Sequence, residues 1–261
     1  MTAATSYQDR THSLWDELAD FQAAQADESL HHLMRGLCRL VNAQTANWIG
    51  AVRMDCHIPN DPVKGWRPRT VIHLDPFSQL HEAVQEQTRQ LEEGEVDLTT
   101  VRNVADAGTF RANRLTDLVP PEWFESVYYR KYYLGTGRID TIWAGIPVNE
   151  NAETYFGIFR DTQHPPFTPG ERDALAYALR GLKWFHRQQM LSRGLLVAST
   201  PLTPVERQVL SNLLNGKTEK EIAAIQSQSP HTTHEYVSAI YRKFGVKNRA
   251  SLMALWLGKA A

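Results

Sequence analysis

The spacing of apolar residues near the N-terminus predicts two helices. An amphipathic helix over residues 12–21 is indicated because its apolar residues recur every three or four positions. Asp27 is placed to cap a second helix. The apolar face of that second helix holds Leu30, Leu33, Met34, Leu37 and Val41.

Four stretches rich in β-branched and aromatic residues predict strands. They cover residues 47–54, 69–74, 139–148 and 154–160. Between the two pairs, residues 76–93 predict a helix, and Pro120 with Pro121 is placed to open another. The polar stretch between these helices has no clear period. This order of elements indicates an α+β domain, in which an antiparallel sheet is flanked by helices.

Thr168-Pro169-Gly170-Glu171 is a capping box with proline at the first helical position. It predicts one long helix that runs to about Leu191. Such a helix could close the domain, pair with its copy in a dimer, or do both. Residues 192–201 (SRGLLVASTP) form the predicted linker, and the apolar Leu195 and Leu196 indicate that it packs against the protein.

The last sixty residues predict four short helices. Two further capping boxes begin at Thr203 and Thr218, and Ser229 with Pro230 starts the third helix. Asn248 begins the fourth. The domain prediction is therefore an α+β sensor domain over residues 1–191, the linker, and an all-α domain over residues 202–261.

The third of these helices has two distinct faces when its residues are placed about 100° apart. One face is apolar and consists of Thr233, Tyr236, Val237, Ile240 and Phe244. The opposite face is polar and consists of His231, His234, Glu235, Ser238 and Arg242. Groups that can hydrogen-bond to base edges, followed by cations, are what a helix in a DNA groove needs. A solvated surface helix would also have a polar face.

The charge distribution supports a polyanionic partner for the tail. The whole chain has 261 residues and a net charge of −1. From Thr200 onward, eight basic residues stand against four acidic ones, which gives this part a net charge of +4. A basic domain on an acidic body favours nucleic acid as the partner of the domain.

The tail resembles the LuxR-type helix-turn-helix, which also occurs in response regulators of the NarL class. The resemblance covers residues 202–255 and rests on five motifs. They are Leu202-Thr203-x-x-Glu206, Gly216-x-Thr218-x-Lys220-Glu221-Ile222-Ala223, Ser229-x-x-Thr232, Ile240-Tyr241-x-Lys243-Phe244-x-Val246 and Asn248-Arg249-x-x-Leu252. It implies a four-helix module whose third helix enters the major groove of double-stranded DNA, usually as a homodimer.

By position, the resemblance implies two groups of DNA-binding residues. The candidates for base contacts are His234, Glu235 and Ser238, and the candidates for phosphate contacts or orientation are Lys220, Thr232, Arg242, Lys243, Lys247 and Arg249. The sequence departs from the family at Gln226, Ser227 and Gln228, where apolar and small residues are usual, and at Glu235, whose charge repels phosphate. These departures affect the expected DNA affinity.

The front domain resembles the GAF-like sensors of the same regulator class, on the order of its elements and on Asp140, Arg160 and the Phe167-Thr168-x-x-Glu171 segment. The autoinducer-binding domain is the alternative, but its Trp, Tyr, Asp-Pro and Trp spacing is matched only at Asp75-Pro76. Both resemblances imply a small-molecule ligand held between the sheet and the middle helices. The aromatic candidates for contact with it are Trp48, Trp66, Tyr132, Trp143 and Tyr155.

The sequence contains no motif for catalysis, for a cofactor or for a metal. It has no apolar run that could span a membrane and no secretory signal, and its two cysteines fit a reducing cytoplasm. We therefore expect a cytoplasmic transcription regulator without enzymatic activity. The alternatives are an acyl-homoserine lactone quorum-sensing receptor, an interaction or anti-activator protein with a degenerate DNA-binding tail, and an enzyme with a regulatory tail.

Overall fold

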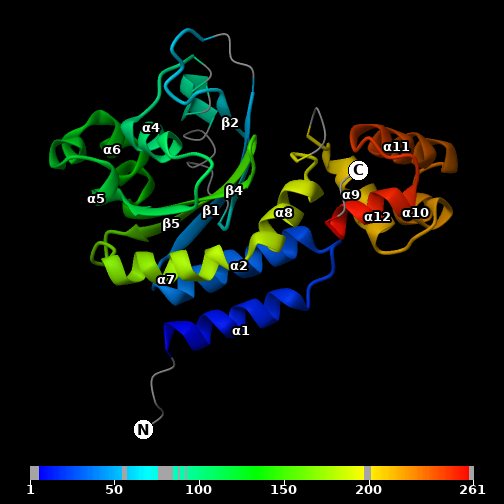
Figure 1. Cartoon of the computed structure of the whole chain (residues 1–261), viewed down its shortest axis with the longest axis horizontal. Helices are drawn as coiled ribbons and strands as arrows, with labels where there is room; N and C mark the ends of the chain where they lie inside the picture. Colours follow the sequence, from blue (N-terminus) through cyan, green and yellow to red (C-terminus); the bar gives the residue numbers. More distant parts are fainter. Residues whose placement is uncertain are drawn as a thin grey trace. The chain divides into compact units, whose positions relative to one another are not determined.

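The computed structural model describes residues 6–54, 58–75, 85–87, 89–91, 93–196 and 201–258. The chain forms two compact units (Figure 1). The first, the sheet unit, consists of Met1–Asp16 and His31–Lys183. The second, the helical unit, consists of Glu17–Leu30 and Trp184–Ala261. The chain is therefore not divided only at the predicted linker, because a short N-terminal segment belongs to the helical unit.

The sheet unit is built on five strands in the order β2-β1-β5-β4-β3, and every neighbouring pair is antiparallel. The strands are β1 Thr45–Arg53, β2 Trp66–His73, β3 Arg111–Arg114, β4 Arg138–Asn149 and β5 Ala152–Asp161. The α+β class with an antiparallel sheet is confirmed. Four strands were predicted. β3 was not, because Arg-Ala-Asn-Arg is short and polar, and it becomes a strand only by pairing with β4.

The central strand β5 is buried on both faces, and its alternating side chains divide the unit into two layers. Phe156 and Ile158 point to one face and Tyr155 and Phe159 to the other. Helix α7 (Pro169–Arg180) and helix α2 (Ala26–Leu40) lie below the sheet in Figure 1, while α4 (Leu98–Ala105), α5 (Leu115–Leu118) and α6 (Val127–Tyr132) lie above it.

The start of α7 is joined to the sheet by the residues on which the GAF-like resemblance rests. Asp140 on β4 accepts a hydrogen bond from the Phe167 amide at 2.7 Å. The Arg160 guanidinium pairs with Glu171, which completes the capping box at Thr168. The same guanidinium lies 4.1 Å from the Phe167 ring centroid. These contacts fix the turn between β5 and α7.

The single long helix expected from Pro169 to Leu191 is wrong. The structure has two helices, α7 and α8 (Lys183–Ser192), with a break at Gly181 and Leu182. A Cβ on Gly181 would lie 2.6 Å from the Trp15 ring, and the Trp15 indole donates to the Ala178 carbonyl at 2.8 Å. That carbonyl would otherwise accept the helical bond from Leu182. A side chain distant in sequence therefore ends the helix.

Smaller differences occur at the other predicted helices. The first is α1 (Tyr7–Ala19), and Asp27 lies inside α2 instead of capping it. The helix expected after Pro120 is divided into η1 (Pro121–Glu125), α6 and η2 (Leu134–Thr136), because Ser126 ends one turn and caps the next. The helix expected over residues 76–93 lies largely outside the described residues.

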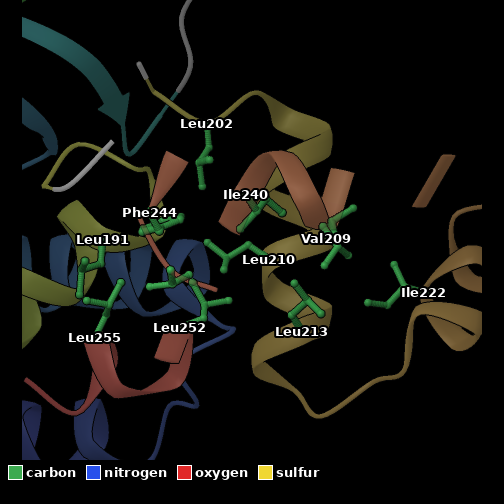
Figure 2. Close-up of a cluster of buried hydrophobic side chains, with 12 residues drawn as sticks. Leu191, Leu202, Val209, Leu210, Leu213, Ile222, Ile240, Phe244, Leu252 and Leu255 are labelled. Atoms are coloured by element: carbon green, nitrogen blue, oxygen red, sulfur yellow. The ribbon is translucent and has the colours of Figure 1, made fainter. Parts of the chain in front are cut away.

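The helical unit contains the four tail helices and α8. The tail helices are α9 (Pro204–Leu214), α10 (Glu219–Ile225), α11 (Pro230–Lys243) and α12 (Arg249–Trp256). Their predicted capping boxes at Thr203 and Thr218 are both present. The buried side chains of these helices meet in one cluster (Figure 2), in which Val209, Leu213, Ile240 and Leu252 are fully enclosed.

Residues 192–196 of the predicted linker, which the structure describes, pack within this unit. Leu191 is one of the buried residues of the cluster and Leu196 packs against it. Arg193 is buried, and its guanidinium bonds to Asp27 at 2.6 Å and to the Gln189 side chain at 2.6 Å. Ser211 on α9 donates to the Ala24 carbonyl at 3.0 Å. The four-helix module therefore rests on α8 and on residues 17–30.

Candidate functional sites

A cavity of about 200 Å³ lies in the sheet unit, on the face of the sheet opposite α7. Alternate residues of β1 (Asn47, Ile49 and Ala51) form its floor together with residues of β2, β4 and β5. Its roof comes from α4, α6 and the segment before α4. Aromatic rings make up much of its wall, and they belong to Trp66, Tyr128, Tyr132, Tyr133, Trp143, Tyr155 and Phe159.

Four of the five aromatic candidates lie on this cavity, namely Trp66, Tyr132, Trp143 and Tyr155. Trp48 is fully buried and is not among the lining residues. The reason is the strand alternation, since Asn47 and Ile49 on either side of it face the cavity and Trp48 faces the opposite layer. The structure brings the four together from three strands and a helix.

Gly157 makes room for this aromatic wall. A Cβ at this position would lie 2.8 Å from both the Phe159 and the Trp143 rings. These two rings meet edge to face, with their centroids 5.7 Å apart. Glycine in the central strand therefore allows two large side chains to cross over its backbone.

One end of the cavity is built on a buried ion pair that the sequence did not indicate. Arg111 on β3 forms two hydrogen bonds with the Glu153 carboxylate, at 3.1 and 2.8 Å, and one with the Tyr155 hydroxyl at 2.8 Å. Tyr155 in turn donates to Glu153 at 2.6 Å. Burial, the largest influence, raises the pKa of Tyr155, so the phenol stays protonated. Gly145 leaves space for the guanidinium.

A second buried arginine, Arg138, lines the cavity and has no such partners among the described residues. Its guanidinium carbon lies 3.8 Å from the centroid of the Phe159 ring. Burial lowers its pKa to about 10, so it is charged at neutral pH. The sequence did not single out Arg138, since a cation at a strand start is usually exposed and only the folded chain shows its burial.

Asp97 is an acidic residue at the cavity roof, and both of its carboxylate oxygens accept hydrogen bonds. One carboxylate oxygen caps α4 by accepting from the Thr99 amide at 2.8 Å. The other oxygen accepts from the Trp123 indole at 2.9 Å. Asp97 therefore links the start of α4 to η1.

The predicted faces of α11 are confirmed by burial. Thr233, Val237, Ile240 and Phe244 are buried, and Tyr236 is half-buried. His231, His234, Glu235, Ser238 and Arg242 are exposed. His234 Nδ1 lies 3.0 Å from a Glu219 carboxylate oxygen on α10, and His231 faces Glu235 one turn away at 3.5 Å. The polar face is open to a partner.

The six candidates for phosphate contact or orientation differ in their existing contacts. Lys220, Arg242 and Lys247 are exposed, and among the residues that the structure describes no acidic group pairs with them. Thr232 is half-buried, and its amide donates to the Ser229 cap at 3.0 Å. Lys243 and Arg249 make internal contacts.

Lys243 and Arg249 hold the module together in this structure. The Lys243 ammonium lies 2.7 Å from a Glu206 oxygen. Arg249 donates to the Lys217 carbonyl at 2.9 Å and to the Leu213 carbonyl at the end of α9. Burial alone would raise the pKa of Glu206, but hydrogen bonds from Lys243 and Thr203 outweigh it and lower that pKa.

The turn between α10 and α11 contains the departures that the sequence showed. Ser227 has φ of 52°, in the left-handed region. The side-chain amide nitrogen and oxygen of Gln226 and the side-chain amide oxygen of Gln228 are buried without a hydrogen-bond partner among the described residues. Polar groups of this kind reduce stability.

The described ranges contain neither a membrane-spanning helix nor a metal-binding cluster. No helix there has the length and apolar character needed to cross a membrane. In the same part of the chain, no three His, Cys, Asp or Glu side chains gather closely enough to hold a metal ion.

Solved structures resemble this chain at low sequence identity. SdiA in complex with octanoyl-rac-glycerol is 14% identical with a TM-score of 0.48, covering 99% of this chain and 96% of that one. The ligand-binding domain of VqsR from Pseudomonas aeruginosa is 12% identical with a TM-score of 0.45, covering 72% and 98%. These values are too low to assign a ligand or a function.

The C-terminal helices have closer relatives. The GerE family model, described as bacterial regulatory proteins of the luxR family, matches residues 200–256. The probable HTH-type transcriptional regulator GfsR of Streptomyces halstedii is 37% identical over 60 residues, which cover 23% of this chain and 25% of that protein. Together with the four capped helices and the exposed face of α11, these matches identify the C-terminal part of this chain as a helix-turn-helix domain of the luxR family.

Proposed function

We propose that this protein is a cytoplasmic transcription regulator that binds double-stranded DNA as a homodimer and responds to a small molecule. The observation that carries the proposal is the exposed polar face of α11 within a luxR-family domain. Its base-contacting residues are His234, Glu235 and Ser238, and the unpaired cations Lys220, Arg242 and Lys247 contact the phosphates. No part of this role requires an enzymatic activity.

A dimer follows from the way in which one short helix reads DNA. A single recognition helix covers few base pairs, whereas two copies on half-sites about 34 Å apart, one helical turn, cover an operator. Glu235 can accept a hydrogen bond from cytosine N4 and its charge disfavours nearby phosphates. We therefore expect a half-site that contains a cytosine opposite Glu235.

The cavity of the sheet unit is the proposed ligand site, with Trp66, Tyr132, Trp143 and Tyr155 as contacts. Trp48 stays a weaker prediction because it faces the other layer. A ligand alters DNA binding only if it binds two arrangements of the protein with different affinity. We propose that the ligand changes the relative placement of the two α11 helices in the dimer.

The test is selection of DNA sequences from a random duplex library by the full-length protein, followed by titration against salt. The proposal expects a selected sequence with two related half-sites. It also expects binding that weakens steeply with salt, because counterions are released from the phosphates. Ser238→Ala should relax sequence preference, while Lys247→Ala should weaken binding to all sequences. Binding of the selected duplex no tighter than random duplex at every salt concentration contradicts the proposal.

A second candidate is an interaction protein that no longer reads DNA. It is favoured by Glu235 on the exposed face of α11. It is also favoured by the Gln226 side-chain amide and the Gln228 side-chain oxygen, which are buried without a hydrogen-bond partner among the described residues. The same selection experiment separates the two functions, since this candidate retains no sequence above background. An acyl-homoserine lactone receptor is a narrower form of the first function.

A further inference from the structure

The two buried arginines of the sheet unit differ in their hydrogen bonds. Arg111 donates to five acceptors, on Asn103, Thr109, Glu153 and Tyr155. Arg138 has no side-chain hydrogen bond or ion pair among the described residues, and its Nη2 atom is fully enclosed. Both lie in the same layer, so burial alone does not explain the difference.

Burying the charge of Arg138 without an ionic partner costs folding free energy. A buried guanidinium loses its hydration, and an unpaired ion costs several kcal/mol after relaxation, which is about the size of a domain's net stability. The Phe159 ring beneath it offsets part of this cost through a cation–π contact. The Phe159 ring, however, lies against the face of the guanidinium. It cannot accept hydrogen bonds from the guanidinium N–H groups, which point outward in the guanidinium plane.

The described cavity wall supplies no carboxylate for Arg138. The acidic residues that line the cavity are Glu95, which is exposed, and Asp97, which is held by Thr99 and Trp123. Among the described residues, the titratable group that favours the charged form of Arg138 is the Tyr133 hydroxyl. The missing partner is therefore an anion that the cavity admits.

The side-chain oxygen of Asn103 indicates a second functional group of the ligand. Oδ1 of Asn103 is buried on the cavity wall without a partner among the described residues. An amide oxygen accepts hydrogen bonds, so its partner is an N–H or O–H donor. The rings of Trp66, Trp143 and Tyr155 offer flat apolar surface between these polar points.

We propose that the cavity binds a small aromatic carboxylate whose carboxylate group pairs with Arg138. The inference rests on the proposed function, in which this cavity is the ligand site. A carboxylate matches the two parallel N–H groups of a guanidinium. An aromatic body stacks on the wall, and a ring N–H or hydroxyl bonds to Asn103. The volume of about 200 Å³ lies below the range of about 300–1,000 Å³ usual for drug-sized ligands, which favours a compact molecule.

The test uses matched pairs of probes on the full-length protein. Indole-3-acetate and 4-hydroxyphenylacetate are compared with their neutral carboxamides, and a short-chain acyl-homoserine lactone serves as a neutral ligand of another shape. Affinity is measured by calorimetry at neutral pH. We expect each carboxylate to bind at least about tenfold more tightly than its amide, a factor worth about 1.4 kcal/mol.

Single substitutions test whether Arg138 is the residue that causes the preference for carboxylates. Arg138→Gln should abolish the preference for carboxylate, and Arg138→Lys should retain part of it because the charge remains. Arg69→Gln removes an exposed arginine of β2 that does not line the cavity and should change nothing. If Arg138→Gln does not fold, the comparison of acid with amide on the unaltered protein still decides the matter.

The outcomes separate the inference from the proposed function. Amides or the lactone binding as tightly as the carboxylates would overturn the anionic ligand and leave the sensor intact. If no probe binds, the inference fails. If, in addition, native mass spectrometry of protein incubated with cell extract shows no bound small molecule, the proposed sensing function fails with it.

Discussion

At the scale of single residues, the cations of the luxR-family domain are of two kinds. Lys220, Arg242 and Lys247 extend into solvent, whereas Lys243 and Arg249 are bound within the domain. Family position suggested phosphate contact or orientation for all five. The internal contacts show that two of them also determine the stability of the module, so the same substitution has different effects at neighbouring positions.

Lys247 and Arg249 provide the clearest comparison. Arg249→Ala removes charged hydrogen bonds to carbonyls at and beyond the end of α9 and should destabilise the helical unit by about 1–3 kcal/mol. Lys247→Ala should leave the melting temperature unchanged and reduce the salt slope of DNA binding by about one. Thermal unfolding and salt titration check both. An unchanged salt slope for Lys247→Ala would argue against its contact with phosphate.

Glu206 gives a pH prediction. Its pKa in the folded protein lies below the ordinary value of 4.5, so its pairing with Lys243 stabilises the protein above about pH 4.5. That stability is lost as the pH falls below 4.5 and through the folded pKa. Glu206→Gln should cost about 1–3 kcal/mol at pH 7, and the loss should shrink toward pH 3. Denaturant unfolding at several pH values measures it, and a loss independent of pH contradicts it.

At the scale of elements, the turn from α10 to α11 combines a left-handed residue with buried polar atoms that have no partner among the described residues. Its strain comes from residues that the sequence marked as unusual, and the structure shows the reason. Gln226 follows the last turn of α10, and its side-chain amide is buried without a hydrogen-bond partner among the described residues. Ser227 adopts a left-handed conformation that costs about 1–2 kcal/mol for a residue with a side chain.

Gln226→Leu should therefore stabilise the protein. The change removes two buried polar atoms without partners and adds apolar contact, and we expect a gain of about 1–3 kcal/mol. Gln208→Leu, on the exposed side of α9, is the matched control and should have no effect on stability. Chemical denaturation of the full-length variants provides the comparison. Equal stability of Gln226→Leu and the unaltered protein would show that the amide has partners in solution.

At the scale of the whole molecule, the luxR-family match does not coincide with the compact unit that contains it. The match covers residues 200–256, but the unit also includes α8, the segment after it and residues 17–30. The hydrogen bond from Arg193 to Asp27 joins the two chain segments that make up this unit. Helix α8 therefore contributes Leu191 to the same core on which α11 packs.

A substitution at Leu191 tests whether the core of the helical unit extends beyond the residues of the family match. It lies outside the family match yet is fully buried in the module core, so Leu191→Ala should destabilise the helical unit by about 2–5 kcal/mol. Leu257→Ala makes the same chemical change at a side chain that is 79% exposed and should cost little. Hydrogen exchange of α11 amides in the full-length protein reports the effect. Equal protection in both variants would contradict the packing.

The sequence by itself determined the elements that depend on local order. Capping boxes at Thr168, Thr203 and Thr218, the apolar face of α11 and four strands follow from patterns within a few residues, because caps and amphipathic periods are set by neighbours in the chain. The luxR-family domain was predictable for the same reason. The aromatic wall was partly predictable, since strand aromatics are buried.

Only the tertiary structure decided the features that depend on distant partners. Trp15 breaks the helix at Gly181, β3 exists because β4 pairs with it, and strand alternation turns Trp48 away from the cavity. The clearest case is the pair of arginines. Arg111 and Arg138 are chemically identical in the sequence, and only the fold places a carboxylate beside one and an open cavity beside the other.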